Sequence, residues 1–219
     1  MGMLRSRFGL VVVIVVAMSG AGPVTACAMD EAATQEAAER SKPSPLQEQA
    51  TNTSALRTQD NAPALPELAG ITGWVNSGPL TLASLRGKVV LVDFWTHGCY
   101  NCLNTLPYLK EWYSKYSPSG FEIVGVHTPE FDYEKRIENV ERFTRENGIG
   151  WPVALDNDYM TWNAYSNRYW PHIFLADTQG CIRYQYVGEG AYEKTEGWIR
   201  RLLVEAGVDV SGIPFGKTG

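Results

Sequence analysis

The sequence predicts an α/β domain in which a central mixed sheet is flanked by helices. A continuous apolar run at residues 89–92 is typical of a buried strand. Farther along the chain, strand-like runs alternate with segments whose apolar residues have helical spacing, which indicates α/β organisation. Near the C-terminus, strand-like runs at residues 172–176 and 181–187 flank a turn at 177–180, and this closing hairpin makes the sheet mixed.

We expect the elements to follow one another in a simple order. Two strands, at residues 71–75 and 80–85, form an N-terminal hairpin around the turn at 76–79. Strands at 89–95, 121–127 and 151–155 alternate with helices that begin at Cys99 and Tyr133. We expect Pro107 to kink the first of these helices, and Asn147 to end the second. A short helix capped by Asp158 precedes the C-terminal hairpin, and a final helix covers residues 192–206.

Length, charge and cysteine content limit the kinds of protein that this chain can be. The 219 residues suit one compact domain, with room for additional segments. The formal net charge of -5 argues against a nucleic-acid-binding surface, which is usually basic. Four cysteines in a chain of this length are too few for a disulfide scaffold, so each is interpreted separately.

The N-terminus, residues 1–27, has the pattern of a secretory signal peptide. Arg5 and Arg7 precede an apolar run at residues 9–18, which is shorter than the roughly 20 residues that a spanning helix needs. An uncleaved membrane anchor is the alternative. Residues 24–27 resemble the lipobox of bacterial lipoproteins, which favours lipidation of Cys27, whereas residues 26–28 also fit ordinary signal cleavage. Either route places the mature protein in the periplasm or cell envelope, with lipidation anchoring it to the membrane.

Residues 28–63 contain mostly small and polar side chains and have too few large apolar residues to form a core. We expect this segment to be a disordered tether. The folded domain is expected at residues 64–215. Within it, Cys181 lies in a strand pattern and is expected to be a buried structural cysteine with a free thiol; a redox or dimer role is the alternative.

The candidate chemistry lies where the apolar strand ends and the first helix begins. Cys99 and Cys102 are separated by two residues there, and the start of a helix stabilises a thiolate through free N–H groups and the helix dipole. Cys99 is therefore the predicted nucleophile, and Cys102 the thiol that resolves the mixed disulfide. A structural disulfide or half of a zinc site are the alternatives, but no second cysteine pair is present to complete a metal site. We expect neither a metal nor a cofactor.

Several motifs together resemble the thioredoxin superfamily. They are Asp93-Phe94-Trp95 three residues before the Cys-x-x-Cys motif, Pro107 five residues after it, and Pro171 at the start of a late strand. The early hairpin and an insert at residues 131–168 resemble the TlpA-like branch of extracytoplasmic thiol–disulfide proteins. Residues 125–130, 155–158 and 167–171 are most similar to the thioredoxin-like domains of DipZ-type proteins. The resemblance covers residues 65–206 and implies a thioredoxin fold.

The resemblance also assigns roles to residues around the dithiol. Asp93 would be a buried proton acceptor for Cys102, and Pro171 would be a cis-proline that faces the disulfide. Trp170 and Trp95 would lie beside the same substrate groove. The possible modulators of the thiolate are His97, Glu130 and His127. The implied partners are protein dithiol or disulfide substrates and a membrane electron donor of the DsbD/CcdA type.

The sequence departs from the family pattern close to the cysteines. Gly98 stands where many TlpA-like proteins have Trp, and Thr105 where many have Glu. The dipeptide between the cysteines is Tyr100-Asn101, and this dipeptide helps to set the reduction potential. The resemblance favours a reductase that serves cytochrome c maturation or envelope redox homeostasis.

Two other functions remain open. Thr96-x-x-Cys99 matches part of the peroxiredoxin signature and would suit a thiol peroxidase, although Val92 occupies the position of the expected proline. A tethered, non-catalytic binding module that uses the fold as a platform is the second alternative.

Overall fold

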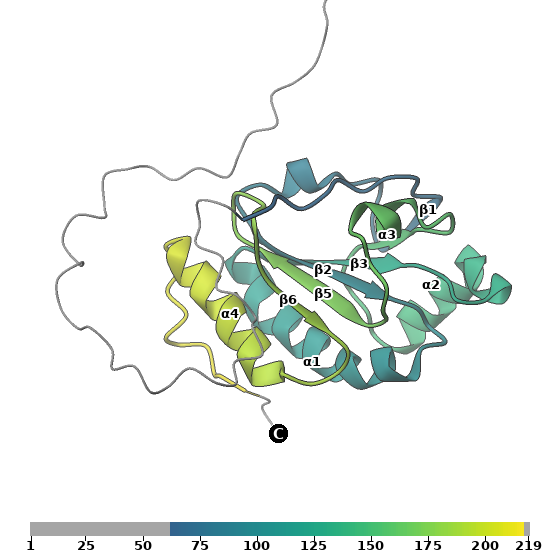
Figure 1. Ribbon diagram of the computed structural model, residues 1–219. Helices are drawn as coiled ribbons and strands as arrows, with labels where there is room; N and C mark the ends of the chain where they lie inside the picture. The colour runs from purple at the N-terminus through teal and green to yellow at the C-terminus, as the bar shows by residue number, and fades with distance from the viewer. Residues whose placement is uncertain (1–61, 217–219) are drawn as a thin grey trace, which may run out of the picture.

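The computed structural model describes residues 62–216, which form a six-stranded sheet in the order β1-β4-β3-β2-β5-β6 (Figure 1). The strands β2, β3 and β4 are parallel, whereas β1, β5 and β6 each run antiparallel to a neighbour. The strands span Gly73–Val75 (β1), Val89–Trp95 (β2), Phe121–His127 (β3), Val153–Leu155 (β4), His172–Ala176 (β5) and Ile182–Val187 (β6). The predicted mixed sheet is confirmed. The expected signal peptide, Cys27 and nearly all of the expected tether lie outside the described residues.

In the described part of the chain, four α-helices and three short 3₁₀ helices accompany the strands, and α4 follows the last strand. The α-helices span Tyr100–Tyr116 (α1), Ile137–Glu146 (α2), Met160–Ala164 (α3) and Tyr192–Glu205 (α4). The 3₁₀ helices span Leu82–Leu85 (η2), Ser117–Ser119 (η3) and Asp132–Lys135 (η4). Among the described residues, no helix combines the length and apolar character that crossing a bilayer would need.

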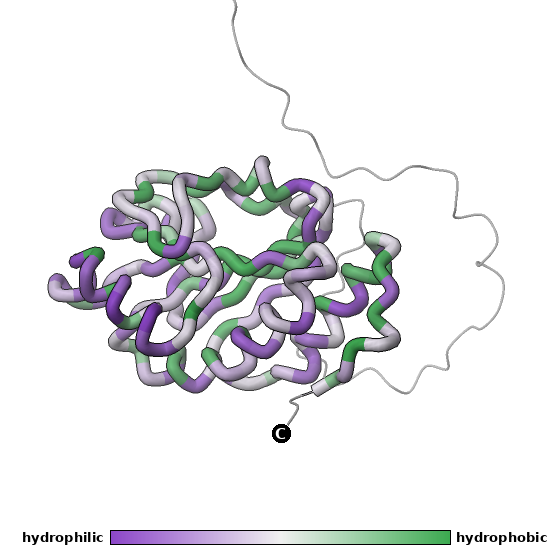
Figure 2. Tube along the Cα trace, turned by 180° about the vertical axis from the view of Figure 1, so that it is seen from behind, coloured by the Kyte–Doolittle hydropathy of each residue, from purple (hydrophilic) through white to green (hydrophobic). Residues whose placement is uncertain are grey.

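Strand β2 lies inside the sheet, and all seven of its residues are buried. Because side chains alternate along a strand, Leu91 and Trp95 face a core built with α1, α2 and α4. Val92 and Phe94 face the opposite core, which contains residues of η2 and α3. Helices therefore cover both faces, as expected, and Figure 2 shows hydrophobic residues along the central strands.

The prediction of an N-terminal hairpin is wrong. Residues 82–85 form the 3₁₀ helix η2, and β1 pairs with β4 instead of with a second N-terminal strand. The hydroxyl of Thr81 accepts a hydrogen bond from the Ser84 N–H and caps η2. Leu82 and Leu85 are three residues apart and both buried. In a strand they would point to opposite faces, whereas in a helix they share the face that covers the sheet.

Two further expectations about helices are corrected. The helix expected from Tyr133 is divided into η4 and α2, which meet at Arg136 in an extended conformation. Asp158 does not cap α3. The buried carboxylate of Asp156 does so, because it accepts hydrogen bonds from the N–H groups of Thr161 and Trp162 at 3.0 and 2.8 Å. Helix α1 continues through Pro107 to Tyr116.

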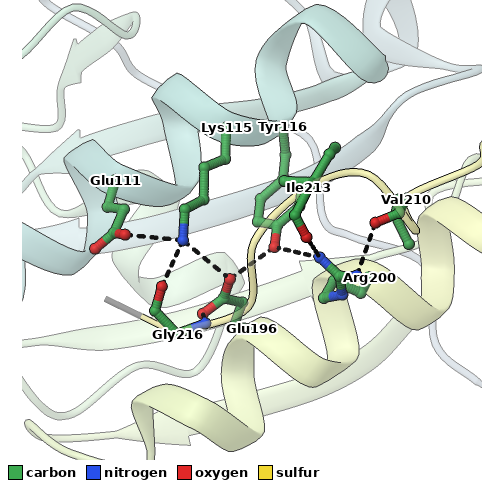
Figure 3. A network of polar contacts seen from close by, with 8 residues as sticks. All are labelled: Glu111, Lys115, Tyr116, Glu196, Arg200, Val210, Ile213 and Gly216. Atoms are coloured by element: carbon green, nitrogen blue, oxygen red, sulfur yellow. Dashed lines mark hydrogen bonds and ion pairs between the residues drawn. The ribbon is translucent and has the colours of Figure 1, made fainter. Parts of the chain in front are cut away.

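A polar network attaches the C-terminal segment to α1 and α4 (Figure 3). Arg200 on α4 donates to the carbonyl oxygens of Val210 and Ile213 at 2.7 and 2.8 Å. Tyr116 on α1 donates to Glu196 at 2.6 Å and accepts a hydrogen bond from Arg200. The network is completed by Glu111, Lys115 and Gly216.

Cys181 lies directly before β6 and is 4% exposed, so its predicted burial is confirmed. Its sulfur belongs to a disulfide bond, and none of the cysteines in the described part of the chain is free. The expectation of a free thiol at this position is wrong.

Candidate active site

The two cysteines of the motif form a disulfide bond at the beginning of α1. Cys99 is the N-cap residue of the helix, and its sulfur accepts a hydrogen bond from the Cys102 N–H at 3.2 Å. Cys99 is half-buried, whereas Cys102 is 2% exposed. Only Cys99 is therefore accessible to a second disulfide, which agrees with the predicted division of roles between nucleophile and resolving thiol.

Asp93 lies on β2 on the face that packs against α1, and it is 2% exposed. Its Oδ1 atom has no hydrogen-bond partner, and burial raises the pKa of this carboxyl from 3.8 to about 7. Asp93 pairs in register with Gly125 on β3. The indole nitrogens of Trp95 and Trp151 lie 2.9 and 3.2 Å from where a Cβ at Gly125 would stand, so only glycine leaves room for them. A carboxyl with a pKa near 7 can accept or release a proton at neutral pH.

The predicted cis peptide bond joins Trp170 to Pro171. Pro171 immediately precedes β5, and His172 pairs in register with Phe94 on β2. Because β2 and β5 are antiparallel, the proline lies at the end of the sheet from which the chain continues to Cys99. The indole N–H of Trp170 donates to the Thr128 carbonyl oxygen at 3.1 Å, which fixes the ring beside this loop.

Two histidines stack beside the loop that leads to Cys99. The rings of His97 and His127 are 5.2 Å apart and nearly parallel, and Nδ1 of His97 is 3.0 Å from Nε2 of His127. The backbone N–H of His97 also points to this Nε2 atom at 3.4 Å, and a backbone N–H can only donate. Nε2 of His127 is therefore an acceptor, and its ring proton is on Nδ1. Burial, followed by the charge of His97, lowers the pKa of His127 to about 3, so this ring is neutral at physiological pH.

Glu134 is a site residue that the sequence did not indicate. Its carboxylate is fully buried, accepts the Gly98 N–H at 2.9 Å, and accepts the N–H groups of Glu130 and Phe131 at 2.6 and 3.0 Å. The predicted modulator Glu130 has an exposed side chain and contributes its backbone instead. The signal available in the sequence was only the position of Glu134 within the insert, four residues after Glu130.

The remaining predicted residues occupy different surroundings. Trp95 is 3% exposed and packs edge-on against His127, so it supports the loop and has almost no surface to offer a substrate. Tyr100, between the cysteines, is 74% exposed, and Tyr169, next to Trp170, is 58% exposed. The accessible groups near the disulfide thus include Cys99 itself, the exposed Asn101 and aromatic side chains.

The fold and the site define a class: a thioredoxin-like domain with a redox-active dithiol, a buried acid on the strand that leads to it and a cis-proline loop at the same end of the sheet. A model of the AhpC/TSA family matches residues 60–185, more than half of the sequence, and the chain belongs to this family.

Named relatives agree with the predicted TlpA-like branch. The protein DipZ of Mycobacterium bovis is 49% identical over 144 residues, which cover 64% of this chain and 21% of DipZ. The chain thus spans about a fifth of the DipZ length. The thiol-disulfide oxidoreductase ResA of Bacillus thuringiensis is 32% identical over 123 residues, covering 56% of this chain and 68% of ResA.

Solved structures confirm the thioredoxin fold. A crystal structure described as a thiol-disulfide isomerase from Corynebacterium glutamicum matches with a TM-score of 0.59 and 30% identity. The match covers 66% of this chain and 97% of that protein.

Proposed function

We propose that this protein is a thiol–disulfide oxidoreductase that works outside the cytoplasm and reduces disulfide bonds in other proteins. The observation that carries this proposal is the Cys99–Cys102 disulfide, with one accessible and one buried residue, together with the Asp93 carboxyl on the preceding strand, whose pKa is raised to about 7. Oxidoreductase names among the relatives support the chemistry. The reducing direction and the process it serves, cytochrome c maturation or envelope redox homeostasis, rest on the resemblance to TlpA-like proteins.

The proposed reaction begins with the reduced dithiol. The Cys99 thiolate attacks one sulfur of the substrate disulfide, the substrate S–S bond breaks, and the first substrate thiolate leaves. Cys102 then loses its proton and attacks the Cys99 sulfur, which releases the second substrate thiolate. The substrate has gained two electrons, and the Cys99–Cys102 disulfide has formed again.

Asp93 is the proposed acceptor of the Cys102 proton. Its carboxyl lies on the face of β2 that packs against α1, the helix that carries Cys102. An acceptor is most effective when its pKa is close to the working pH, which burial achieves here. The Asp93→Asn variant should therefore form the mixed disulfide normally but resolve it slowly.

The substrate is proposed to bind as an extended polypeptide segment across the loop at Trp170 and Pro171. This loop lies at the same end of the sheet as the disulfide. Exposed Tyr100 and Tyr169 provide apolar surface that suits a polypeptide partner.

Electrons are proposed to come from a membrane protein of the DsbD/CcdA type. Residues 1–27 are proposed to direct export, and residues 28–63 to tether the domain. Lipidation of Cys27 is the favoured form of anchoring, with ordinary signal cleavage as the alternative. A lipidated cysteine has no thiol left, so lipidation of Cys27 would exclude its participation in a disulfide. The intact mass of the mature protein, before and after reduction, distinguishes a lipid adduct from an intrachain disulfide.

Trapping of the mixed disulfide tests the proposed function. The Cys102→Ser variant, expressed in the native envelope, should retain substrates on Cys99 as adducts that a reductant releases. Cys99→Ser is the matched control and should retain none. If Cys102→Ser captures no protein, the oxidoreductase proposal is wrong. A reduction potential close to about -270 mV would support the reducing direction, and one near about -120 mV would indicate an oxidase.

A thiol peroxidase is the second candidate, because the Thr96-x-x-Cys99 spacing is present. The Thr96 hydroxyl is fully buried, 3.2 Å from His127, and this position does not favour contact with a peroxide at Cys99. Rapid consumption of hydrogen peroxide by the reduced protein would favour the thiol peroxidase over the oxidoreductase. A non-catalytic binding role would be favoured if replacing both cysteines by serine left the cellular function intact.

A further inference from the structure

The segment directly before Cys99 is held by the insert between β3 and α2. The Glu134 carboxylate on η4 accepts three backbone N–H groups, one of which belongs to Gly98. The side chain is 0% exposed. Hydrogen bonds from several N–H groups to a buried carboxylate are strong and geometrically specific. The position of the Cys99 loop therefore depends on a residue 36 positions away from Gly98.

The same contact explains why residue 98 is glycine. The φ angle of Gly98 is not positive, so its backbone does not require glycine. A Cβ atom at this position would instead overlap Oε1 of Glu134 and lie 2.9 Å from the Tyr133 hydroxyl. The absence of a side chain at Gly98 is the condition that lets the carboxylate reach the active-site loop.

The carboxylate also lies where its charge affects the dithiol. Two opposing influences meet at Cys99: the N-terminus of α1 stabilises a thiolate, and a nearby negative charge disfavours it. Burial lowers the pKa of His97, two residues before Cys99, and the charge of Glu134 acts against this lowering. The other titratable groups around the loop and Glu134 include Asp93, His97, His127, Glu130, Tyr133, Arg142 and Tyr159.

We propose that Glu134 is a positioning residue of the dithiol, which fixes the backbone before Cys99 and makes the Cys99 thiolate less favourable. At a pH where Cys99 ionises in the reduced protein, disfavouring the thiolate disfavours the reduced state, so Glu134 makes the couple more strongly reducing. This inference rests on the proposed oxidoreductase function and concerns its direction.

The size of the effect of Glu134 on the ionisation of Cys99 follows from the distance between the carboxylate and the sulfur. A hydrogen bond to Gly98 places the carboxylate on the order of 6–9 Å from the Cys99 sulfur, because one residue spans about 3.8 Å. With an effective dielectric constant of about 40–60, between the values for a protein surface and for water, a unit charge at that distance changes an ionisation equilibrium roughly three- to tenfold. A tenfold change in a two-electron couple corresponds to about 30 mV.

The test uses the full mature protein with Glu134→Gln, Gly98→Ala and the control Glu138→Gln. Glu134→Gln removes the charge at almost constant shape. Gly98→Ala displaces the Glu134 carboxylate from the loop but leaves its charge in the protein. Glu138 is exposed on α2, so Glu138→Gln removes the same charge away from the loop. Two quantities are measured: the pH midpoint of iodoacetamide alkylation of Cys99, and the equilibrium between dithiol and disulfide in glutathione buffers at a pH above the wild-type midpoint.

Glu134→Gln should lower the alkylation midpoint by about 0.5–1 pH unit and shift the equilibrium three- to tenfold towards the dithiol. Gly98→Ala should act in the same direction, by a smaller amount, and Glu138→Gln should match the wild type. If Glu134→Gln and Gly98→Ala lower the melting temperature but leave both quantities unchanged, Glu134 is only structural and the proposal fails. If Glu134→Gln does not fold, the test rests on Gly98→Ala, and the proposal fails if this variant leaves the alkylation midpoint and the redox equilibrium unchanged.

Neither measurement requires a protein substrate. A wild-type protein that reduces no protein disulfide would contradict the proposed function while leaving these two measurements interpretable. The two failures can therefore be told apart.

Discussion

Replacing Asp93 by asparagine should stabilise the folded, oxidised protein, and the gain should depend on pH. The pKa of Asp93 is about 7 in the folded state, against 3.8 for an ordinary carboxyl. Below both values the carboxyl is protonated in the folded and unfolded chains, and its ionisation has no effect on stability. As the pH rises from about 4 to 7, the unfolded chain releases this proton while the folded chain retains it. The free energy of unfolding then falls by about 1.4 kcal/mol per pH unit.

Above pH 7 both states are ionised and the penalty is constant. A difference of roughly 3 pH units corresponds to about 4 kcal/mol, and the full burial of Asp93 means that solvent does not screen it. Asparagine does not titrate. Asp93→Asn should therefore exceed the wild type in stability by about 4 kcal/mol more at pH 8 than at pH 4.

Urea unfolding of both oxidised proteins at pH 4, 6 and 8 measures this difference. Any unpaired polar atom on the new amide adds an offset that does not vary with pH, so the change with pH is the decisive quantity. Asp158→Asn, which removes an exposed carboxylate, is the control and should follow the wild type. A stability difference between Asp93→Asn and wild type that stays the same from pH 4 to 8 would refute the burial argument.

Three further predictions concern other parts of the domain. NMR of the imidazole nitrogens should show His127 neutral, with its proton on Nδ1, from pH 5 to 8; a titration near pH 6.5 would contradict its buried acceptor role. Arg200→Met should cost about 2–3 kcal/mol, since the charged hydrogen bonds to Val210 and Ile213 are lost, and should make the C-terminal segment sensitive to protease. Unchanged urea midpoint and digestion pattern would show that Arg200 does not anchor this segment. Phe94→Ala should cost about 3–5 kcal/mol in urea unfolding, because Phe94 is fully buried against the rings of Trp162, Tyr165 and Phe174. A loss below about 1 kcal/mol would mean that this core rearranges to fill the space.

The sequence by itself determined the elements whose signals are local. The strands β2, β3 and β5 have the predicted bounds because each is a run of apolar residues between clear turn residues. The dithiol could also be located from the sequence, since the start of a helix and the spacing of two cysteines are local properties. The cis bond at Pro171 followed from the resemblance, which relies on the order of motifs along the chain.

Only the tertiary structure decided which residues surround that dithiol. Helical and strand-like patterns are hard to distinguish in short segments, so residues 82–85 fit a strand by sequence, and only the burial of both leucines of η2 reflects the helical conformation. Glu134 contacts Gly98 across 36 positions, and His97 contacts His127 across 30. Such contacts depend on how β3 and the insert pack against the Cys99 loop, and no local pattern encodes them. Burial, which raises the pKa of Asp93 and lowers that of His127, is likewise a property of the assembled sheet and helices.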